Sequence, residues 1–244
     1  MAARVAEVSA HVVRQKTPLR LFIPFGGYKS PASSEFPNAS WAEVFTVAGM
    51  CELVSPICAV HPPGVIVEFS SDEAVVPIFM GAKRKFLDQY HQKFECILNE
   101  LAKFQRGKLI LKQSLLYDHY NIDRLSCRIN RRSEVLKHRW FPMLAPEEKR
   151  RLLGAAERNY FSSLPKDSRI RQEILTRSLC QHQAYLEIDN VERAPILFAP
   201  DTVPIALRRG LESGLHLGSN RRSAVQFWVG AGYWISVSQL RELI

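Results

Sequence analysis

Short apolar runs and longer helical patterns alternate along the first part of the chain. In residues 19–25 (LRLFIPF) every second side chain is apolar, and Phe22 adds an apolar side chain on the other face. That pattern predicts a strand buried on both faces, as in a parallel sheet. A helix-like run over residues 41–60 follows, and we expect this helix to end near Pro56 or soon after. A Pro-Pro-Gly turn then leads into a second strand, predicted over residues 65–69.

Residues 83–105 form the clearest amphipathic helix. Its apolar side chains recur at intervals of three and four: Phe86, Tyr90, Phe94, Ile97, Leu101 and Phe104. A third short strand is predicted over residues 108–112. Strand, helix, strand, helix, strand is the pattern of α/β proteins with right-handed crossovers. We therefore predict an α/β fold: a single Rossmann-like domain over residues 1–244, with a mostly parallel sheet and flanking helices. Residues 1–16 are a flexible or helical N-terminal extension of it.

The second half of the chain is mainly helical in pattern. Residues 124–158 have helical composition, broken near Pro142 and Pro146, and a further helix is predicted from Arg169 to about Asn190. Short strands are predicted in APILF and VPIAL, on either side of a Pro-Asp turn, and another over residues 225–229.

Charge separates the middle of the chain from the rest. The 244 residues hold 33 Lys and Arg against 24 Asp and Glu, a net charge of +9. Residues 124–158 alone hold ten Lys or Arg against four Glu, which is six of the nine surplus charges. Such a run favours a polyanionic partner, RNA or a phosphorylated substrate, although a solvated helix face is the usual meaning of a charge run.

Composition excludes several classes of protein. No apolar run approaches the length of a membrane span, and the first residues lack the apolar core of a secretion signal. The five cysteines are widely spaced without a CxxC pair, which indicates a reducing compartment, and we expect a cytoplasmic protein. Histidine and cysteine spacings match no metal motif, so neither a metal nor another cofactor is expected. The oligomeric state is not predicted.

Polar side chains follow each of the three predicted strands. Tyr28, Lys29 and Ser30 follow a Gly-Gly turn after the first strand, and Ser70-Ser71-Asp72-Glu73 follows the second. Tyr117-Asp118-His119-Tyr120 follows the third. Parallel strands place their carboxyl ends at one edge of a sheet, where open α/β proteins bind ligands. Each cluster also has a purely structural interpretation as a loop or helix cap, and Glu43 in particular completes a capping box with Ser40.

The stretch that contains the first two predicted strands carries a resemblance to a known family. At FIPFGGYKSP, WAEVF, PPG and VEFSSDE, residues 18–75 resemble the amino-terminal part of the isocyanide synthases. That family converts the amine of an amino acid to an isonitrile with a sugar phosphate. The resemblance implies that Lys29, Glu43 and Asp72 are site residues. The match fails beyond residue 110, where the later motifs of the family are not evident.

A second resemblance is architectural. A small, basic, Rossmann-like protein with an Arg-rich central helix is similar to the transfer-RNA-dependent cyclodipeptide synthases, including divergent members that use arginine. That family binds the acceptor stem with a basic helix and uses a strand-end serine as acyl acceptor, with a Tyr and a Glu on a later helix. Ser30, Tyr185 and Glu187 are the nearest equivalents, although Pro24 stands where the serine is expected and the Tyr-Glu spacing differs.

The extended basic region decides between the two families, because a sugar-phosphate enzyme needs only one anion pocket. We therefore predict an aminoacyl-tRNA-dependent cyclodipeptide synthase-like transferase, with an isocyanide synthase-like enzyme as the alternative and a non-enzymatic RNA-binding module as the third interpretation. The expected partners are aminoacyl-tRNA and an amino-acid-derived small substrate. The predicted catalytic residues are Tyr28, Lys29, Ser30, Glu43, Asp72, Tyr185 and Glu187. The predicted substrate-binding residues are Ser71, Glu73, Tyr117 and Asp118. The predicted phosphate-binding residues are Arg128, Arg131, Arg132, Lys149, Arg150, Arg151, Arg221 and Arg222.

Overall fold

The computed structural model describes most of the chain up to residue 204 and short strands beyond it. The described residues are 2–24, 38–39, 41–71, 75–104, 108–115, 121–160, 162–192, 199–204, 216–217, 225–229 and 233–236. They belong to two compact units. Unit 1 comprises residues 1–71, 88–114 and 195–244, and unit 2 comprises residues 72–87 and 115–194. The prediction of one domain over the whole chain stays a prediction.

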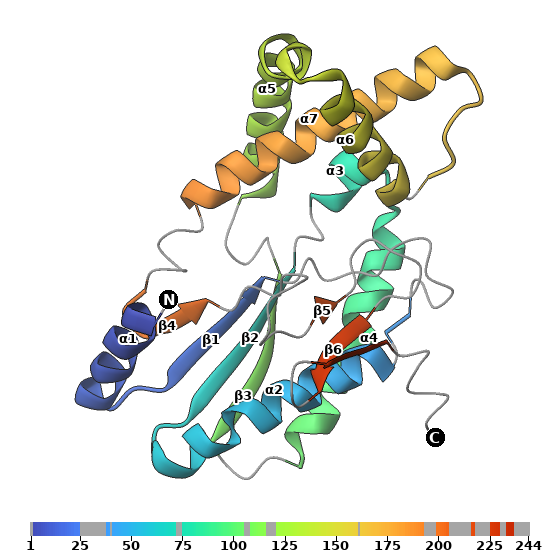
Figure 1. Ribbon diagram of the computed structural model, residues 1–244. Coiled ribbons are helices and arrows are strands. Elements are labelled where there is room, and N and C mark those ends of the chain that lie inside the picture. The colour runs from blue at the N-terminus through green and yellow to red at the C-terminus, as the bar shows by residue number, and fades with distance from the viewer. Residues whose placement is uncertain are drawn as a thin grey trace. The chain divides into compact units, whose positions relative to one another are not determined.

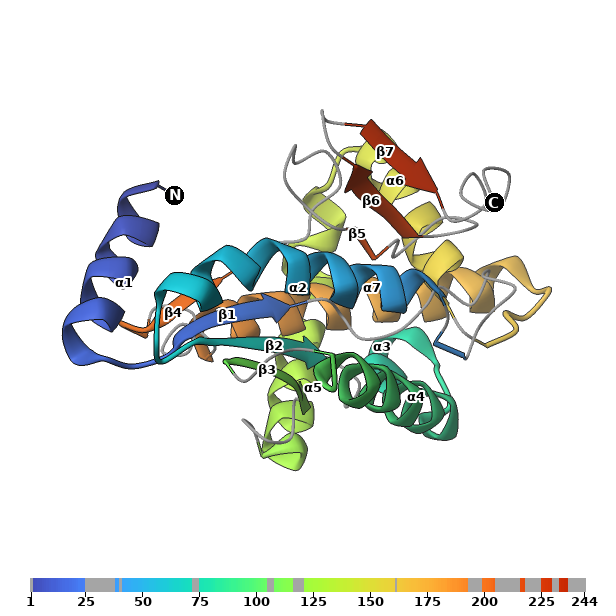
Figure 2. The same cartoon turned by 90° about the horizontal axis from the view of Figure 1, so that it is seen from below.

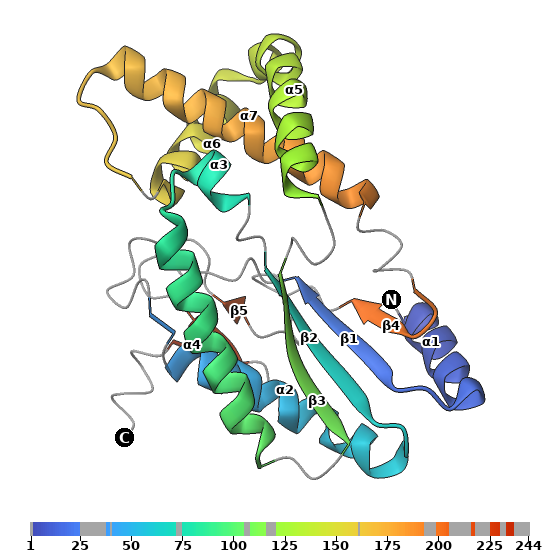
Figure 3. The same ribbon diagram turned by 180° about the vertical axis from the view of Figure 1, so that it is seen from behind.

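A four-stranded sheet forms the centre of unit 1 (Figure 1). Its strands are β1 (Leu19–Pro24), β2 (Val65–Ser71), β3 (Leu109–Leu115) and β4 (Thr202–Pro204), in the order β3-β2-β1-β4. β1 pairs in parallel with both β2 and β4, and Figure 3 shows β3 and β4 at opposite edges of the sheet. The predicted fold class, an α/β Rossmann-like fold with a mostly parallel sheet and flanking helices, is confirmed.

Three helices of unit 1 contribute to the core on one face of this sheet. They are α1 (Ala2–Gln15), α2 (Trp41–Val60) and α4 (Arg84–Ala102), whose first four residues belong to unit 2. Figure 2 shows α2 running alongside β1 and β2. Alternate side chains of β1 and β2 meet side chains of the three helices in a single apolar cluster, in which Phe69 packs edge-on against Phe94 at 5.3 Å between ring centroids. α1 therefore belongs to the fold, because Val8 and Val12 are buried in that cluster.

Gly64 joins the beginnings of three strands. It has a φ of +83°, and a Cβ at this position would lie 2.0 Å from the carbonyl oxygen of Lys108. Its own carbonyl accepts a hydrogen bond from Leu19 N at 3.0 Å, and the next residue, Val65, donates to Lys108 O at 2.8 Å. Only glycine combines that backbone conformation with so close an approach.

The elements that lie wholly within unit 2 are, among its described residues, helical. They are α3 (Val76–Met80), α5 (Ile122–Arg139), the 3₁₀ turn η2 (Phe141–Met143), α6 (Pro146–Asn159) and α7 (Ser168–Glu192). The Asn121 side chain caps α5 by accepting a hydrogen bond from Arg124 N at 3.0 Å. One face of α5 is buried, and it consists of Leu125, Ile129, Ser133 and Leu136.

The predicted elements agree with the structure, with a few corrections. α2 continues four residues beyond Pro56, to Val60. β3 begins one residue later than predicted and extends to Leu115, because the polar residues Gln113 and Ser114 still fit an alternating pattern. β6 (Val225–Val229) was predicted, whereas its antiparallel partners β5 (His216–Leu217) and β7 (Tyr233–Ser236) and the short helix α3 were not. The APILF strand prediction lies outside the described residues. No helix within the described ranges is long and apolar enough to cross a membrane.

Candidate active site

A buried hydrogen-bonded chain lies at the carboxyl ends of β2 and β3. Ser71 is the last residue of β2, and its Oγ lies 3.1 Å from Nε2 of His91 on α4. The other ring nitrogen of His91, Nδ1, accepts a hydrogen bond from the side-chain amide of Gln113 on β3. Ser71 is fully buried and His91 is buried. The carboxyl edge of the sheet, where the sequence predicted a site, therefore has a defined polar constellation.

The imidazole of His91 is neutral at physiological pH. Burial lowers the pKa of His91 from its ordinary value of 6.5 to about 4, because the surroundings disfavour the charged ring. A neutral imidazole has one N–H donor and one acceptor nitrogen. With Gln113 donating to Nδ1, the proton of His91 resides on Nε2 and faces Ser71.

A second buried contact joins the beginning of α2 to the same stretch of α4. Glu43, in the first turn of α2, is fully buried, and its Oε1 accepts a hydrogen bond from the Tyr90 hydroxyl at 3.3 Å. Burial and the charge of Glu43 raise the pKa of Tyr90 well above its ordinary value, so that Tyr90 stays protonated and donates. We call Glu43, Ser71, Tyr90, His91 and Gln113 the strand-end cluster.

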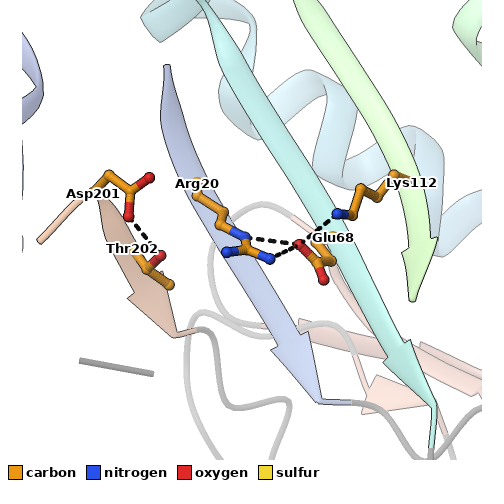
Figure 4. A network of polar contacts seen from close by, with 5 residues as sticks. All are labelled: Arg20, Glu68, Lys112, Asp201 and Thr202. Carbon is orange, nitrogen blue, oxygen red and sulfur yellow. Dashed lines mark hydrogen bonds and ion pairs between the residues drawn. The ribbon is translucent and has the colours of Figure 1, made fainter. Parts of the chain in front are cut away.

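The opposite face of the sheet carries a charged network instead (Figure 4). Glu68 on β2 is fully buried, and its Oε2 accepts from Arg20 Nε on β1 at 2.7 Å and lies 3.4 Å from Lys112 Nζ on β3. Burial alone would raise the pKa of Glu68, but Arg20 and Lys112 outweigh burial and hold the pKa below its ordinary value. The carboxylate therefore stays ionised inside unit 1. Two residues further along β2, the buried Ser70 hydroxyl has no hydrogen-bond partner among the described residues.

In unit 2 the structure brings together two residues that the sequence had assigned to different roles. Arg132, a predicted phosphate contact on α5, donates through Nε to Oε2 of Glu187 on α7 at 2.7 Å. Tyr185 is buried and stacks on Phe79 of α3, with 5.8 Å between the ring centroids. The catalytic roles predicted for Tyr185 and Glu187 stay predictions, and one of these side chains packs in the core of unit 2 while the other forms an ion pair.

The exposed face of α5 carries a row of arginines. Arg124, Arg128, Arg131 and Arg139 are all exposed and lie outside the buried face of this helix; we call them the α5 basic stripe. Arg124 and Arg139 are 15 positions apart, and over that distance a helix rises about 22 Å. On α6, Arg150 and Arg151 are exposed, and Arg151 lies 3.7 Å from Glu148. Lys149 is half-buried and donates to Pro142 O at 2.8 Å, so that it ties η2 to α6.

Many predicted site residues lie outside the described part of the chain and stay predictions. They are Tyr28, Lys29, Ser30, Asp72, Glu73, Tyr117, Asp118, Arg221 and Arg222. The Ser40 cap predicted for α2 also lies outside it. In the described ranges, no three His, Cys, Asp or Glu side chains are grouped as metal ligands.

Sequence reasoning missed Tyr90, His91 and Gln113 in the strand-end cluster. Tyr90 had been counted as an ordinary apolar position of the amphipathic helix, and Gln113 lies just past the predicted end of the third strand. One residue of the charged network could have been recognised from the sequence. Glu68 interrupts the apolar strand VIVEF, and a carboxylate in such a strand needs a cationic partner.

The geometry thus defines an α/β protein with polar side chains at the carboxyl edge of a parallel sheet. No protein-family model matches the chain, and no curated protein matches its sequence. Among solved structures, the fold is similar to that of the PvcA protein from Pseudomonas aeruginosa. The two are 16% identical with a TM-score of 0.54, over 85% of this chain and 73% of PvcA. A CDPS, or cyclodipeptide synthase, from Fluoribacter dumoffii is also found, at 11% identity and a TM-score of 0.36, over 79% of this chain and 92% of that chain.

Proposed function

We propose that this protein is an aminoacyl-tRNA-dependent transferase of the cyclodipeptide synthase type, which forms a cyclic dipeptide, with arginine as a candidate amino acid, in specialised metabolism. The observation that carries the proposal is the α5 basic stripe. Four arginines on one exposed helix face, backed by a buried apolar face, present a fixed row of cations over about 22 Å. A single phosphate would occupy only a small part of such a row, whereas the backbone of an RNA can follow it.

The strand-end cluster supports an enzyme over a simple RNA-binding module. A binding module has no need for a fully buried carboxylate beside a tyrosine, or for a buried histidine with hydrogen-bond partners at both ring nitrogens. Such groups suit the recognition of an amino-acid-sized substrate in a site without bulk water. The predicted residues Lys29, Ser30 and Asp72 would complete that site.

A second candidate function is an isocyanide synthase-like reaction, which converts an amino-acid amine to an isonitrile with a sugar phosphate. Glu43 is the observation that favours it. The sequence resemblance implies a site residue at this position, and here the carboxylate is fully buried and accepts a hydrogen bond from Tyr90. The fold similarity to PvcA agrees with either candidate.

Product analysis separates the candidates. The full chain is expressed in bacteria, and cell extracts are searched by mass spectrometry for cyclic dipeptides, with Lys29→Ala as the inactive comparison. In a cell-free reaction, ribonuclease should abolish product formation if the amino acids arrive on tRNA. An isonitrile that depends on added ribulose phosphate and resists ribonuclease would instead establish the second candidate. RNA binding without either product would leave only a binding module.

The role of the α5 basic stripe is tested by neutralising two of its arginines. Arg131→Gln with Arg139→Gln should lower tRNA affinity at least tenfold and reduce the slope of log affinity against log salt by about 1 per residue. A control with the same change in net charge, Lys85→Gln on α4 with Lys103→Gln just after this helix, should leave that slope unchanged. Equal effects of the two double variants would show that only the overall charge matters.

A further inference from the structure

The hydrogen-bonded chain through His91 has a direction. The amide nitrogen of Gln113 can only donate, so the Nδ1 atom of His91 is the acceptor. The ring proton then resides on Nε2 and is donated to Ser71 Oγ at 3.1 Å. A hydroxyl that accepts in this way keeps its own proton for a further hydrogen bond. Each donor polarises the next, so the chain strengthens the Ser71 hydroxyl as a donor.

The described residues provide no acceptor for that last proton. The only side-chain hydrogen bond of Ser71 within the described ranges is the one to His91, and Ser71 is fully buried. A buried hydroxyl without an acceptor costs free energy, so such a group normally has a partner. Ser71 is the last residue of β2, at the edge of a parallel sheet where α/β proteins bind ligands.

We propose that the Ser71 hydroxyl, oriented by His91 and Gln113, donates a hydrogen bond to a carboxylate or carbonyl oxygen of the bound amino-acid substrate. The proposal rests on the proposed function for the class of substrate. Ser71 is the group that touches the substrate, and His91 and Gln113 are positioning residues. All three groups are neutral, which suits a buried site, because a neutral chain can stabilise developing negative charge without the desolvation cost of a buried cation. The low pKa of His91, about 4, keeps the ring in this neutral form.

An opposite direction of the chain would assign Ser71 a different role. If the Gln113 amide turned over, its oxygen would accept from His91 Nδ1–H, and Nε2 would accept the Ser71 proton. Ser71 would then be an activated nucleophile with His91 as its base. Gln113→Glu separates the two directions, since a carboxylate can only accept. It enforces the nucleophile arrangement and removes the proton that our proposal directs to the substrate.

The ring tautomer is read by nitrogen NMR of the full chain labelled at histidine. We expect the proton on Nε2 of His91 in the wild type and on Nδ1 in Gln113→Glu. A wild-type ring protonated on Nδ1 would overturn the proposal, whatever product the protein makes. The proteinogenic amino acids are then added one at a time at millimolar concentration. At least one should shift the His91 Nε2 signal in the wild type and not in Ser71→Ala, and no shift from any of them would also overturn the proposal.

Product formation adds a functional measurement. Ser71→Ala should slow formation of the cyclic dipeptide on the order of 10²-fold, as loss of one preorganised donor does elsewhere, and Ser71→Thr should restore most of the rate. Gln113→Glu should be slow, and a faster Gln113→Glu would establish the nucleophile arrangement instead. Ser70→Ala is the matched control, since the neighbouring hydroxyl lies on the other face of the sheet, and it should retain the wild-type rate. If the wild type makes no cyclic dipeptide, the proposed function fails, while the tautomer and the amino-acid titration still decide the proposal for Ser71.

Discussion

The strand-end cluster of unit 1 and the α5 basic stripe of unit 2 use polar groups in opposite ways. The cluster is buried except for the half-buried Gln113, it is held by two sets of hydrogen bonds, and its histidine is kept neutral by its surroundings. The stripe is exposed and charged, and it lies on the solvent side of an amphipathic helix. A buried neutral group acts over one hydrogen-bond length and depends on exact placement of its neighbours, whereas an exposed charge acts over about 10 Å at moderate salt and tolerates movement.

The charged network on the other face of the sheet lies between these extremes. Glu68 is as buried as the strand-end cluster, yet it is ionised and depends on Arg20, whose side chain is 24% exposed. Its pKa is held below the ordinary value, so its contribution to stability is present above the unfolded-state pKa and is lost as the pH falls towards the folded-state pKa. The comparison therefore teaches that burial alone does not decide whether a group is neutral here. At Glu68 the cationic partners decide it.

The largest effect is expected from removing that partner. Arg20→Met should lower the free energy of unfolding of unit 1 by about 3–5 kcal/mol, because it leaves the buried Glu68 carboxylate without its closest cation. Lys112→Met is the control, since Lys112 is 46% exposed and 3.4 Å away, and it should cost less than about 1 kcal/mol. Denaturant-dependent hydrogen exchange of β1 and β2 amides measures both. Similar costs for the two variants would show that Glu68 does not depend on Arg20.

The second-largest effect is expected at His91, the neutral histidine of the strand-end cluster, where the free energy of unfolding depends on pH. The folded-state pKa of His91 is about 4, below its ordinary value of 6.5. Between these two pH values the histidine binds a proton in the unfolded chain and does not bind one in the folded chain. Stability from this residue is therefore complete above pH 6.5 and falls by about 3 kcal/mol as the pH decreases to 4. His91→Gln should remove that part of the acid sensitivity. Unfolding curves at pH 7 and pH 4.5 compare the two proteins, and an unchanged difference between the two pH values in the variant would contradict a buried neutral ring.

The two regions also differ in how far the sequence predicts them. Arg124 and Arg128 of the α5 stripe are visible from spacing alone, because helical periodicity places residues four apart on one face and the apolar residues mark the buried side. The fold class was equally accessible, since alternating strands and helices with right-handed crossovers are typical of a parallel α/β sheet. The local pattern therefore predicted both the fold class and the basic helix.

The strand-end cluster could not be predicted in the same way. His91 bonds to partners 20 and 22 residues away in sequence, on two neighbouring strands, and nothing in the local pattern of α4 distinguishes it from a solvent-facing histidine. Its partner Gln113 looked like the first loop residue after a strand. Such contacts depend on the packing of a helix over a sheet. Sequence patterns place a residue on a face, but they do not say which polar groups meet there.

A smaller effect is expected within the cluster from Tyr90→Phe. It removes the hydrogen bond to Glu43 at 3.3 Å and should cost about 1–2 kcal/mol, since the buried carboxylate loses a donor. Glu43→Gln keeps an acceptor oxygen and removes the charge, so it should lower the raised pKa of Tyr90 while retaining the contact. Ultraviolet titration of the phenol follows the pKa, and chemical denaturation follows the stability. A Tyr90 pKa that does not change in Glu43→Gln would show that burial alone raises it.

The smallest effect is expected at the surface of unit 2, from the pair of Arg132 and Glu187. Their side chains are 45% and 35% exposed, and the Nε–Oε2 distance is 2.7 Å. Water and salt screen a pair of this exposure, so a double-mutant cycle with Arg132→Ala and Glu187→Ala should give a coupling of about 0.5 kcal/mol that decreases as salt is added. The same cycle with Arg131 in place of Arg132 is the control, and it should give a coupling near zero. A coupling several times larger and insensitive to salt would mean that this pair behaves like Arg20 and Glu68. The contrast between buried polar groups in unit 1 and a screened, charged surface in unit 2 would then not hold at this position.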